Sequence, residues 1–208
     1  MGKKQVLLIG PRGGGKTEIL RNYTGSCEKN SGATQGLNNG STGKLFRKIH
    51  ITEIGGGTVE LANNEITNMV GKLQPDKIIF VFDGVSFFEQ LQNPSNGGEI
   101  YSRLINCYWN PLFVESSSKD GVSSKDGASC PCFKTDKFNL ICTHTDKHDG
   151  DLREDILNAI DKANKEYSEL INSNTPRYFK ERFDKPYCYY INATNTKEVK
   201  DTIDQILE

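Results

Sequence analysis

The stretch GPRGGGKT, residues 10–17, decides how the rest of the chain is interpreted. It follows a continuous apolar run at residues 6–9, which indicates a short buried strand. It precedes Ile19 and Leu20, which favour a short helix. The clustered glycines permit a backbone path that side chains would obstruct. The sequence therefore predicts a strand, a glycine-rich turn and a helix in succession.

This stretch fits the pattern G-x-x-x-x-G-K-[ST] of phosphate-binding loops, or P-loops. In such a loop the backbone N–H groups and the start of the following helix surround the phosphates. We expect Lys16 to place its ammonium on the outer phosphates and Thr17 to offer its hydroxyl to Mg²⁺. The glycines expected to contact the phosphates are Gly10, Gly13, Gly14 and Gly15. The pattern predicts a bound nucleotide but does not select its base.

Strand-like and helix-like segments alternate along the chain. We expect strands at residues 3–9, 44–54, 77–82, 138–143 and 187–191. We expect helices after the glycine-rich stretch, at residues 59–73, 99–109 and 151–172, and after a cap at Asn195, with a loop at residues 24–43. The alternation predicts an α/β fold of the P-loop NTPase type, with a mostly parallel six-stranded sheet and helices on both faces. Ligands of such sheets bind at the carboxyl ends of the strands.

The bulk composition predicts a single domain over residues 1–208. Residues 116–129 are almost entirely Ser, Lys, Asp and Gly, which indicates a flexible surface insertion. The 26 basic and 27 acidic side chains give a net charge of −1, which offers no electrostatic support for binding nucleic acid. No apolar run is long enough to cross a bilayer, so we expect no integral membrane segment. Six scattered cysteines, with Cys142 and Cys188 inside apolar runs, favour a reducing compartment and hence a cytoplasmic protein.

Three cysteines raise the question of a metal site outside the P-loop. Cys130 and Cys132 are close in sequence and could be joined by Cys107. Their spacing matches neither a zinc ribbon nor a zinc finger, and no fourth ligand is evident. An ordinary set of reduced cysteines therefore fits the sequence better, although the pattern leaves the metal alternative open.

Polar residues at the ends of the later strands favour guanine. Asp146 follows the strand expected at residues 138–142, and a carboxylate there can accept hydrogen bonds from both guanine N1–H and N2–H₂. Adenine offers no such pair of donors, so one Asp can carry most of the selection. The last apolar strand ends at residues 192–194, where a backbone N–H could meet guanine O6. The alternative for Asp146 is a simple cap of the next turn.

The chain resembles a small GTPase, and most closely the ADP-ribosylation-factor-like (Arf-like) branch. The stretches TQGLN and EIGGG resemble the T-I-G-F-N of switch I and the D-V-G-G-Q of switch II in that branch. IFVFD resembles its I-F-V-V-D strand, THTD stands in place of N-K-x-D, and NAT in place of C-A-T or S-A-K. These five stretches are residues 34–38, 53–57, 79–83, 143–146 and 192–194. Their order agrees over nearly the whole chain, apart from the region around 110–135.

The resemblance implies a role for each matching position. Thr34 would bind Mg²⁺ and the γ-phosphate, and Thr17 would be the other metal ligand. Glu53 would hold a magnesium-bound water, and the Gly56 N–H would touch the γ-phosphate. The implied catalytic set is Lys16, Thr34, Gly56 and Gly57, and the implied contacts to the base side are Thr143, His144, Asp146, Ala193 and Thr194. GTP and GDP would be the ligands, and effector and regulator proteins the partners.

Three departures from the family pattern bear on chemistry. Gly57 falls where the water-orienting Gln would be, which predicts slow hydrolysis. Arg12 occupies a loop position that the family fills with Gly or Asp, where its guanidinium could either reach the γ-phosphate or crowd the site. His144 replaces Lys, and its imidazole could stack on the base or remain a loop residue without base contact. Thr34 lies in a polar stretch and could equally be inert.

Two other functions remain open at this point. A P-loop kinase or ATPase uses the same loop, although a nucleotide kinase needs a basic lid that Arg177 and Arg182 do not obviously form. A pseudo-GTPase would hold its nucleotide without turnover. The base preference separates the first alternative from a GTPase, and kinetics separates the second.

Overall fold

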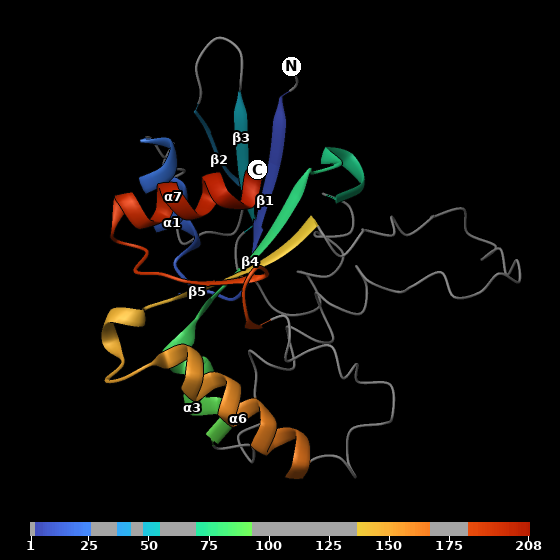
Figure 1. Cartoon of the computed structure of the whole chain (residues 1–208). Coiled ribbons are helices and arrows are strands. Elements are labelled where there is room, and N and C mark those ends of the chain that lie inside the picture. The colour runs from blue at the N-terminus through green and yellow to red at the C-terminus, as the bar shows by residue number, and fades with distance from the viewer. Residues whose placement is uncertain (1–2, 26–36, 43–47, 55–69, 93–136, 167–182) are drawn as a thin grey trace, which may run out of the picture.

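A mostly parallel six-stranded sheet forms the centre of this computed structural model (Figure 1). The structure describes residues 3–25, 37–42, 48–54, 70–92, 137–166 and 183–208. In spatial order the strands are β2 (Leu37–Thr42), β3 (Ile49–Ile54), β1 (Lys4–Ile9), β4 (Lys77–Asp83), β5 (Phe138–Thr143) and β6 (Cys188–Tyr190). Among these strands β2 alone runs antiparallel to its neighbour. The predicted α/β fold is confirmed.

Helices cover both faces of the sheet. Figure 1 shows α1 (Lys16–Thr24, blue) beside α7 (Thr196–Leu207, red), while α3 (Gly84–Gln92) lies beside α6 (Leu152–Glu166). Successive strand residues point to opposite faces. Leu7 therefore packs in the core under α3 and α6, whereas Leu8 packs in the core under α1 and α7.

The central strands were predictable because both of their faces are covered. In β4 the residues from Ile78 to Phe82 are all fully buried, and every residue of β5 is buried. A strand enclosed on both sides needs a continuous apolar run, which is what residues 77–82 and 138–143 display. The predictions of β1, β4, β5 and β6 are confirmed to within a residue or two.

The expected loop at residues 24–43 is wrong in part, because Leu37–Thr42 forms strand β2. This segment is polar and lies at the edge of the sheet, paired only with β3, with Asn38 opposite Glu53. An edge strand is half exposed, so it needs no apolar run. Its antiparallel pairing to β3 is a long-range contact that local sequence does not reveal.

Helix α3 was not predicted. It begins immediately after β4, where Asp83 Oδ1 accepts hydrogen bonds from the backbone N–H groups of Val85 and Ser86. An Asp at that position is an ordinary helix cap. Phe87 is fully buried and stacks on Phe183 in the same core.

The last helix follows its predicted pattern. The Asn195 side chain accepts hydrogen bonds from the backbone N–H groups of Lys197 and Glu198, at 3.1 and 3.3 Å. The predicted apolar positions Val199, Ile203 and Ile206 are buried. The Asn195 cap and the helix after it are confirmed.

Several predictions concern regions only partly covered by the structure. The helix expected at 59–73 is described over residues 70–73, which are helical, and the one expected at 151–172 is α6, described as far as Glu166. The helix expected at 99–109, the insertion at 116–129 and the cysteines Cys107, Cys130 and Cys132 lie outside the described residues. Within the described part, no helix is both long enough and apolar enough to cross a membrane.

Candidate nucleotide site

The phosphate loop joins the carboxyl end of β1 to the start of α1 and lies directly on β4. A Cβ added to Gly10 would stand 2.1 Å from the Val81 carbonyl oxygen, and one added to Gly14 would stand 2.7 Å from it. Gly10 also has φ of 135°, which side chains disfavour. Gly13 differs, because the space around it is open and only its φ of 82° favours glycine. Glycine at positions 10 and 14 therefore lets the loop backbone lie against strand β4.

Lys16 turns back into the loop that precedes it. Its Nζ donates hydrogen bonds to the carbonyl oxygens of Gly10 and Pro11, at 2.9 and 2.7 Å. The side chain is almost fully buried, and this burial lowers its pKa to about 8, against the opposing effect of the Glu53 carboxylate. A buried ammonium held by two neutral carbonyls is well placed to exchange them for anionic oxygens, as the sequence predicts for phosphate.

Thr17 faces the carboxylate of Glu53. Its hydroxyl oxygen lies 2.8 Å from Oε1 and 3.0 Å from Oε2, and Asn38 Nδ2 donates to Oε2 at 2.9 Å. Glu53 is only 2% exposed, so these hydrogen bonds satisfy a buried carboxylate. Hydroxyl and carboxylate oxygens are the ligands that Mg²⁺ prefers. The donor set therefore fits the predicted metal, although Thr34, the second predicted ligand, lies outside the described residues.

Thr143 supports the phosphate loop from the end of β5. It is fully buried, and its hydroxyl lies 2.9 Å from the Gly14 carbonyl oxygen and 3.0 Å from that of Phe82. Its methyl group also borders Gly15, where an added Cβ would meet it at 3.2 Å. Thr143 is one of the residues predicted to contact the nucleotide, and in the structure its side chain contacts the phosphate loop.

His144 is turned toward the end of β4. Its backbone is left-handed, with φ of 60°, and its Nδ1 lies 3.2 Å from Asp83 Oδ2 and 3.2 Å from the Thr143 hydroxyl. The other oxygen of Asp83 caps α3, so one carboxylate links that helix to the segment expected to hold the base. Sequence reasoning missed this contact. The signal that pointed to it was an Asp at the end of an apolar strand.

The remaining base-side residues lie at the ends of β5 and β6. Asp146 is exposed in the short 3-10 helix η4 (Thr145–Lys147). Ala193 follows β6, and its Cβ would lie 3.4 Å from a Cβ added to Gly15. Thr194 is exposed and bonds to the Asn192 side chain through both its N–H and its hydroxyl. The structure thus brings the predicted base-side turns against the phosphate loop.

Three other predicted residues complete the comparison. Arg12 is exposed at the tip of the loop. Gly56 and Gly57 lie outside the described residues, so their roles stay predictions.

A separate hollow of about 410 Å³ lies beside the first turn of α6, lined by Thr145, Gly150, Asp151, Leu152, Arg153 and Tyr190. Its charged side chains already form hydrogen bonds or ion pairs with other groups of the chain. Asp151 accepts from the backbone N–H groups at the start of α6, and Arg153 is paired with Asp184. The Tyr190 hydroxyl donates to the Phe183 carbonyl oxygen. The charged side chains that line this hollow are therefore already paired within the protein.

Comparison with known proteins supports the fold and no closer assignment. No protein-family model matches the chain, and no curated protein does. The Arl6 BBS3 small GTPase from Trypanosoma brucei, solved with the nucleotide analogue GppNp, is similar at 15% identity and a TM-score of 0.52, over 99% of this chain and 96% of that one. A probable GTP-binding protein, engB, is similar at 16% identity and a TM-score of 0.53, over 98% of each chain. Together with the strand order and the phosphate loop, these similarities show that the chain has the α/β P-loop fold found in small GTPases.

Proposed function

We propose that this protein is a GTP-binding molecular switch of Arf-like type that hydrolyses GTP slowly. The observation that carries the proposal is the convergence at Gly15, where the phosphate loop meets Thr143 from the end of β5 and Ala193 from the end of β6. The loop that we propose holds the phosphates and the two turns that we propose read the base would thus lie side by side around the ligand. This is the arrangement a purine nucleotide requires at the carboxyl ends of parallel strands.

The phosphate side of the proposed site uses groups that the fold already aligns. The N-terminus of α1 and the loop N–H groups would hold the phosphates, and Lys16 would exchange its two carbonyl partners for phosphate oxygens. Thr17 would turn its hydroxyl oxygen from Glu53 to Mg²⁺, and Thr34 would join it. Bound Mg²⁺ neutralises part of the phosphate charge. Glu53 would keep a metal-bound water in place through its bond to Asn38.

The base side would select guanine. The Asp146 carboxylate is exposed and can accept from guanine N1–H and N2–H₂. The Ala193 N–H makes no hydrogen bond within the described residues, so it is available for guanine O6. Adenine would leave the carboxylate without donors and would present a donor to the Ala193 N–H.

The switch itself would depend on the γ-phosphate. Thr34 and Gly56 would contact it in the GTP form and lose it after hydrolysis, which frees both segments. Effector and regulator proteins would distinguish the two forms, in the cytoplasm. Gly57 supplies no side chain to orient the attacking water, so turnover would be slow without a partner.

The proposal is tested by base selection. Affinities for GDP, ADP and xanthosine diphosphate are measured for the wild type and for Asp146→Asn. The wild type should prefer GDP to ADP by at least about tenfold, because adenine would lose the hydrogen bonds of guanine to Asp146 and would present a donor to the Ala193 N–H. Asp146→Asn should lose GDP and gain xanthosine diphosphate, since the amide N–H₂ can donate to the xanthine 2-oxygen. Equal affinity of the wild type for GDP and ADP would contradict the proposal and favour an ATPase or kinase.

A further inference from the structure

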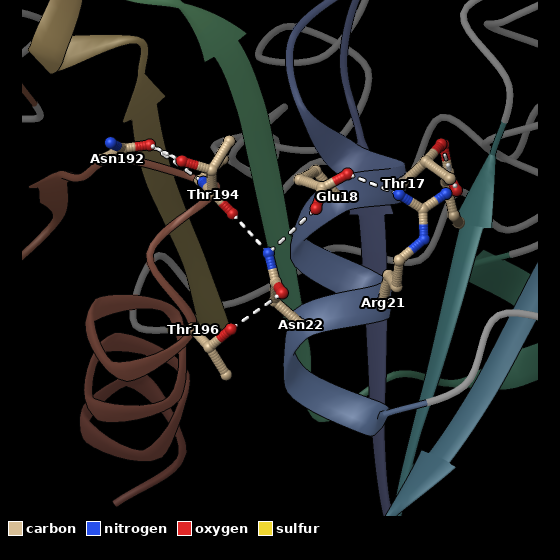
Figure 2. A network of polar contacts seen from close by, with 9 residues as sticks. Thr17, Glu18, Arg21, Asn22, Asn192, Thr194 and Thr196 are labelled. Carbon is tan, nitrogen blue, oxygen red and sulfur yellow. Dashed lines mark hydrogen bonds and ion pairs between the residues drawn. The ribbon is translucent and has the colours of Figure 1, made fainter.

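Asn22 on helix α1 reaches across to the turn that follows β6. Its Nδ2 donates to the Ala193 carbonyl oxygen at 2.8 Å and to Glu18 Oε1 at 3.1 Å. Its Oδ1 accepts from the Thr196 hydroxyl at 2.9 Å. Figure 2 shows the Asn22 side chain in the gap between α1 and this turn, with Glu18 on one side and Thr196 on the other. One amide thus joins three separate groups.

The orientation of this amide is fixed by its partners. A backbone carbonyl and a carboxylate can only accept, so the N–H₂ group must face Ala193 and Glu18. Flipping the amide would place its oxygen against both acceptors. The Thr196 hydroxyl, in the first turn of α7, then completes the remaining side. Glu18 is itself held by Arg21 Nη1 at 2.7 Å.

Most backbone polar groups of the turn at residues 192–195 are hydrogen-bonded. The Asn192 carbonyl accepts from the Asn195 N–H at 2.9 Å, and the Thr194 N–H donates to the Asn192 side chain at 2.9 Å. Glu198 Oε2 accepts from the Asn192 N–H at 2.8 Å. Asn22 holds the Ala193 carbonyl, so both peptide planes next to Ala193 are fixed. Among the backbone N–H groups of residues 192–195, all of which the structure describes, that of Ala193 is the donor left for a ligand.

The geometry points to Asn22 as a positioning residue that aims the Ala193 N–H at guanine O6. This inference rests on the proposed function and adds to it a residue of α1 that never touches the nucleotide. Without Asn22 the Ala193 carbonyl loses its partner, and the peptide plane between Ala193 and Thr194 keeps only the bond of the Thr194 N–H to Asn192. This plane can then tilt, and because it shares the Ala193 Cα with the plane that carries the Ala193 N–H, the direction of that N–H becomes less well fixed. The contact to O6 then weakens, while the contact of Asp146 to N1–H and N2–H₂, made from a different turn, persists.

The experiment compares three ligands that differ at single positions of the base. GDP is the reference, 6-thioguanosine diphosphate replaces O6 by a poorer acceptor, and inosine diphosphate lacks the 2-amino group that Asp146 would bind. Binding is measured for the wild type, Asn22→Leu and Asn22→Asp. The control is Tyr23→Phe, which removes another polar link between α1 and α7, the hydrogen bond to Asp204 at 2.8 Å, without touching the turn.

The wild type should prefer GDP to its 6-thio analogue by about three- to tenfold, the usual effect of one neutral hydrogen bond. That preference should approach one in Asn22→Leu and Asn22→Asp, while the preference for GDP over inosine diphosphate stays within about twofold of the wild type. Tyr23→Phe should keep both preferences. Thr196→Val, which frees Asn22 Oδ1 but spares the bond to Ala193, should lower the first preference partly.

The outcomes separate this inference from the proposed function. If the wild type does not distinguish GDP from ADP, the proposed function is wrong and the role of Asn22 falls with it. If the wild type selects guanine but the Asn22 variants keep the wild-type preference over the 6-thio analogue, only the role of Asn22 is wrong. Equal losses for all three ligands in the Asn22 variants would mean that Asn22 merely stabilises the fold, and would also overturn the inference.

Discussion

The hydroxyl of Thr143 lies 2.9 Å from the carbonyl oxygen of Gly14 and ties the end of strand β5 to the phosphate loop. Its single proton can serve either this oxygen or that of Phe82, and the side chain is fully buried. The bond therefore joins two segments far apart in sequence at the point where the proposed site is built.

Replacing Thr143 by Val should destabilise the protein by about 1–3 kcal/mol, because a buried carbonyl loses its donor while the shape is kept. Urea unfolding should show a lower midpoint with an unchanged slope. Thr143→Ser keeps the hydroxyl and serves as the control. If Ser destabilises as much as Val, the methyl group packed against Gly15 matters and the hydrogen bond does not.

The pair formed by Thr17 and Glu53 predicts a dependence of nucleotide binding on Mg²⁺. EDTA should weaken GDP binding strongly in the wild type and much less in Thr17→Asn, which has already lost the hydroxyl ligand. Thr17→Ser retains a hydroxyl and should behave like the wild type. Equal effects of EDTA on the wild type and Thr17→Asn would show that Thr17 does not bind the metal.

Lys16 predicts proton uptake on nucleotide binding. Burial lowers its pKa to about 8 in the free protein, and bound phosphate would raise that pKa by favouring the ammonium. Binding should therefore take up about 0.1 proton at pH 7 and about 0.75 at pH 8.5, and affinity should fall as pH rises above 8. Calorimetry in buffers of different ionisation enthalpy measures the uptake. Lys16→Arg, which stays charged, is the control, and uptake independent of pH would refute the assignment.

Arg12 and Gly57 predict the rate of hydrolysis. Single-turnover GTP hydrolysis by the wild type should lie at or below about 10⁻⁴ to 10⁻³ per second, because Gly57 cannot orient water. Gly57→Gln should raise the rate, and Arg12→Gly should not lower it, because an arginine helps only when the water is already in line. A faster wild-type rate that falls on Arg12→Gly would show that Arg12 is catalytic.

Elements with an unbroken apolar run or a periodic apolar side could be predicted from the sequence, whereas the polar edge strand β2 and the short helix α3 could not. Strands β4 and β5 can be recognised in the sequence because a strand covered on both faces needs an unbroken apolar run. Helix α7 can be recognised from the Asn195 cap and from its periodic apolar side. Strand β2 has neither signal, since its stability comes from pairing with β3 and its polar residues suit an edge. Helix α3 is short, and its cap Asp83 is also the last residue of strand β4, so the sequence does not distinguish a cap from the end of a strand.

The candidate site shows the same division. The residue spacing of the phosphate loop identifies Lys16 and Thr17, because contacts to phosphate and metal restrict which residue types can stand at each position of the loop. The internal partners of the site are set by tertiary contacts. Neither the bond of Thr143 to Gly14 nor that of Asn22 to Ala193 has a local signature, since each joins residues more than a hundred positions apart.

The contact of Gly10 and Gly14 with the Val81 carbonyl limits the ways in which this sequence can diverge. A backbone oxygen cannot rotate away as a side chain can. Selection for a folded protein is therefore enough to keep glycine at both positions, whether or not the protein binds a nucleotide. A lineage that abandoned catalysis would retain these glycines, while Arg12, exposed at the loop tip, remained open to change. The presence of these glycines in a related chain would therefore indicate that the fold is kept and would not by itself indicate catalysis. A change in chemistry would be expected to appear first in the residue at position 12.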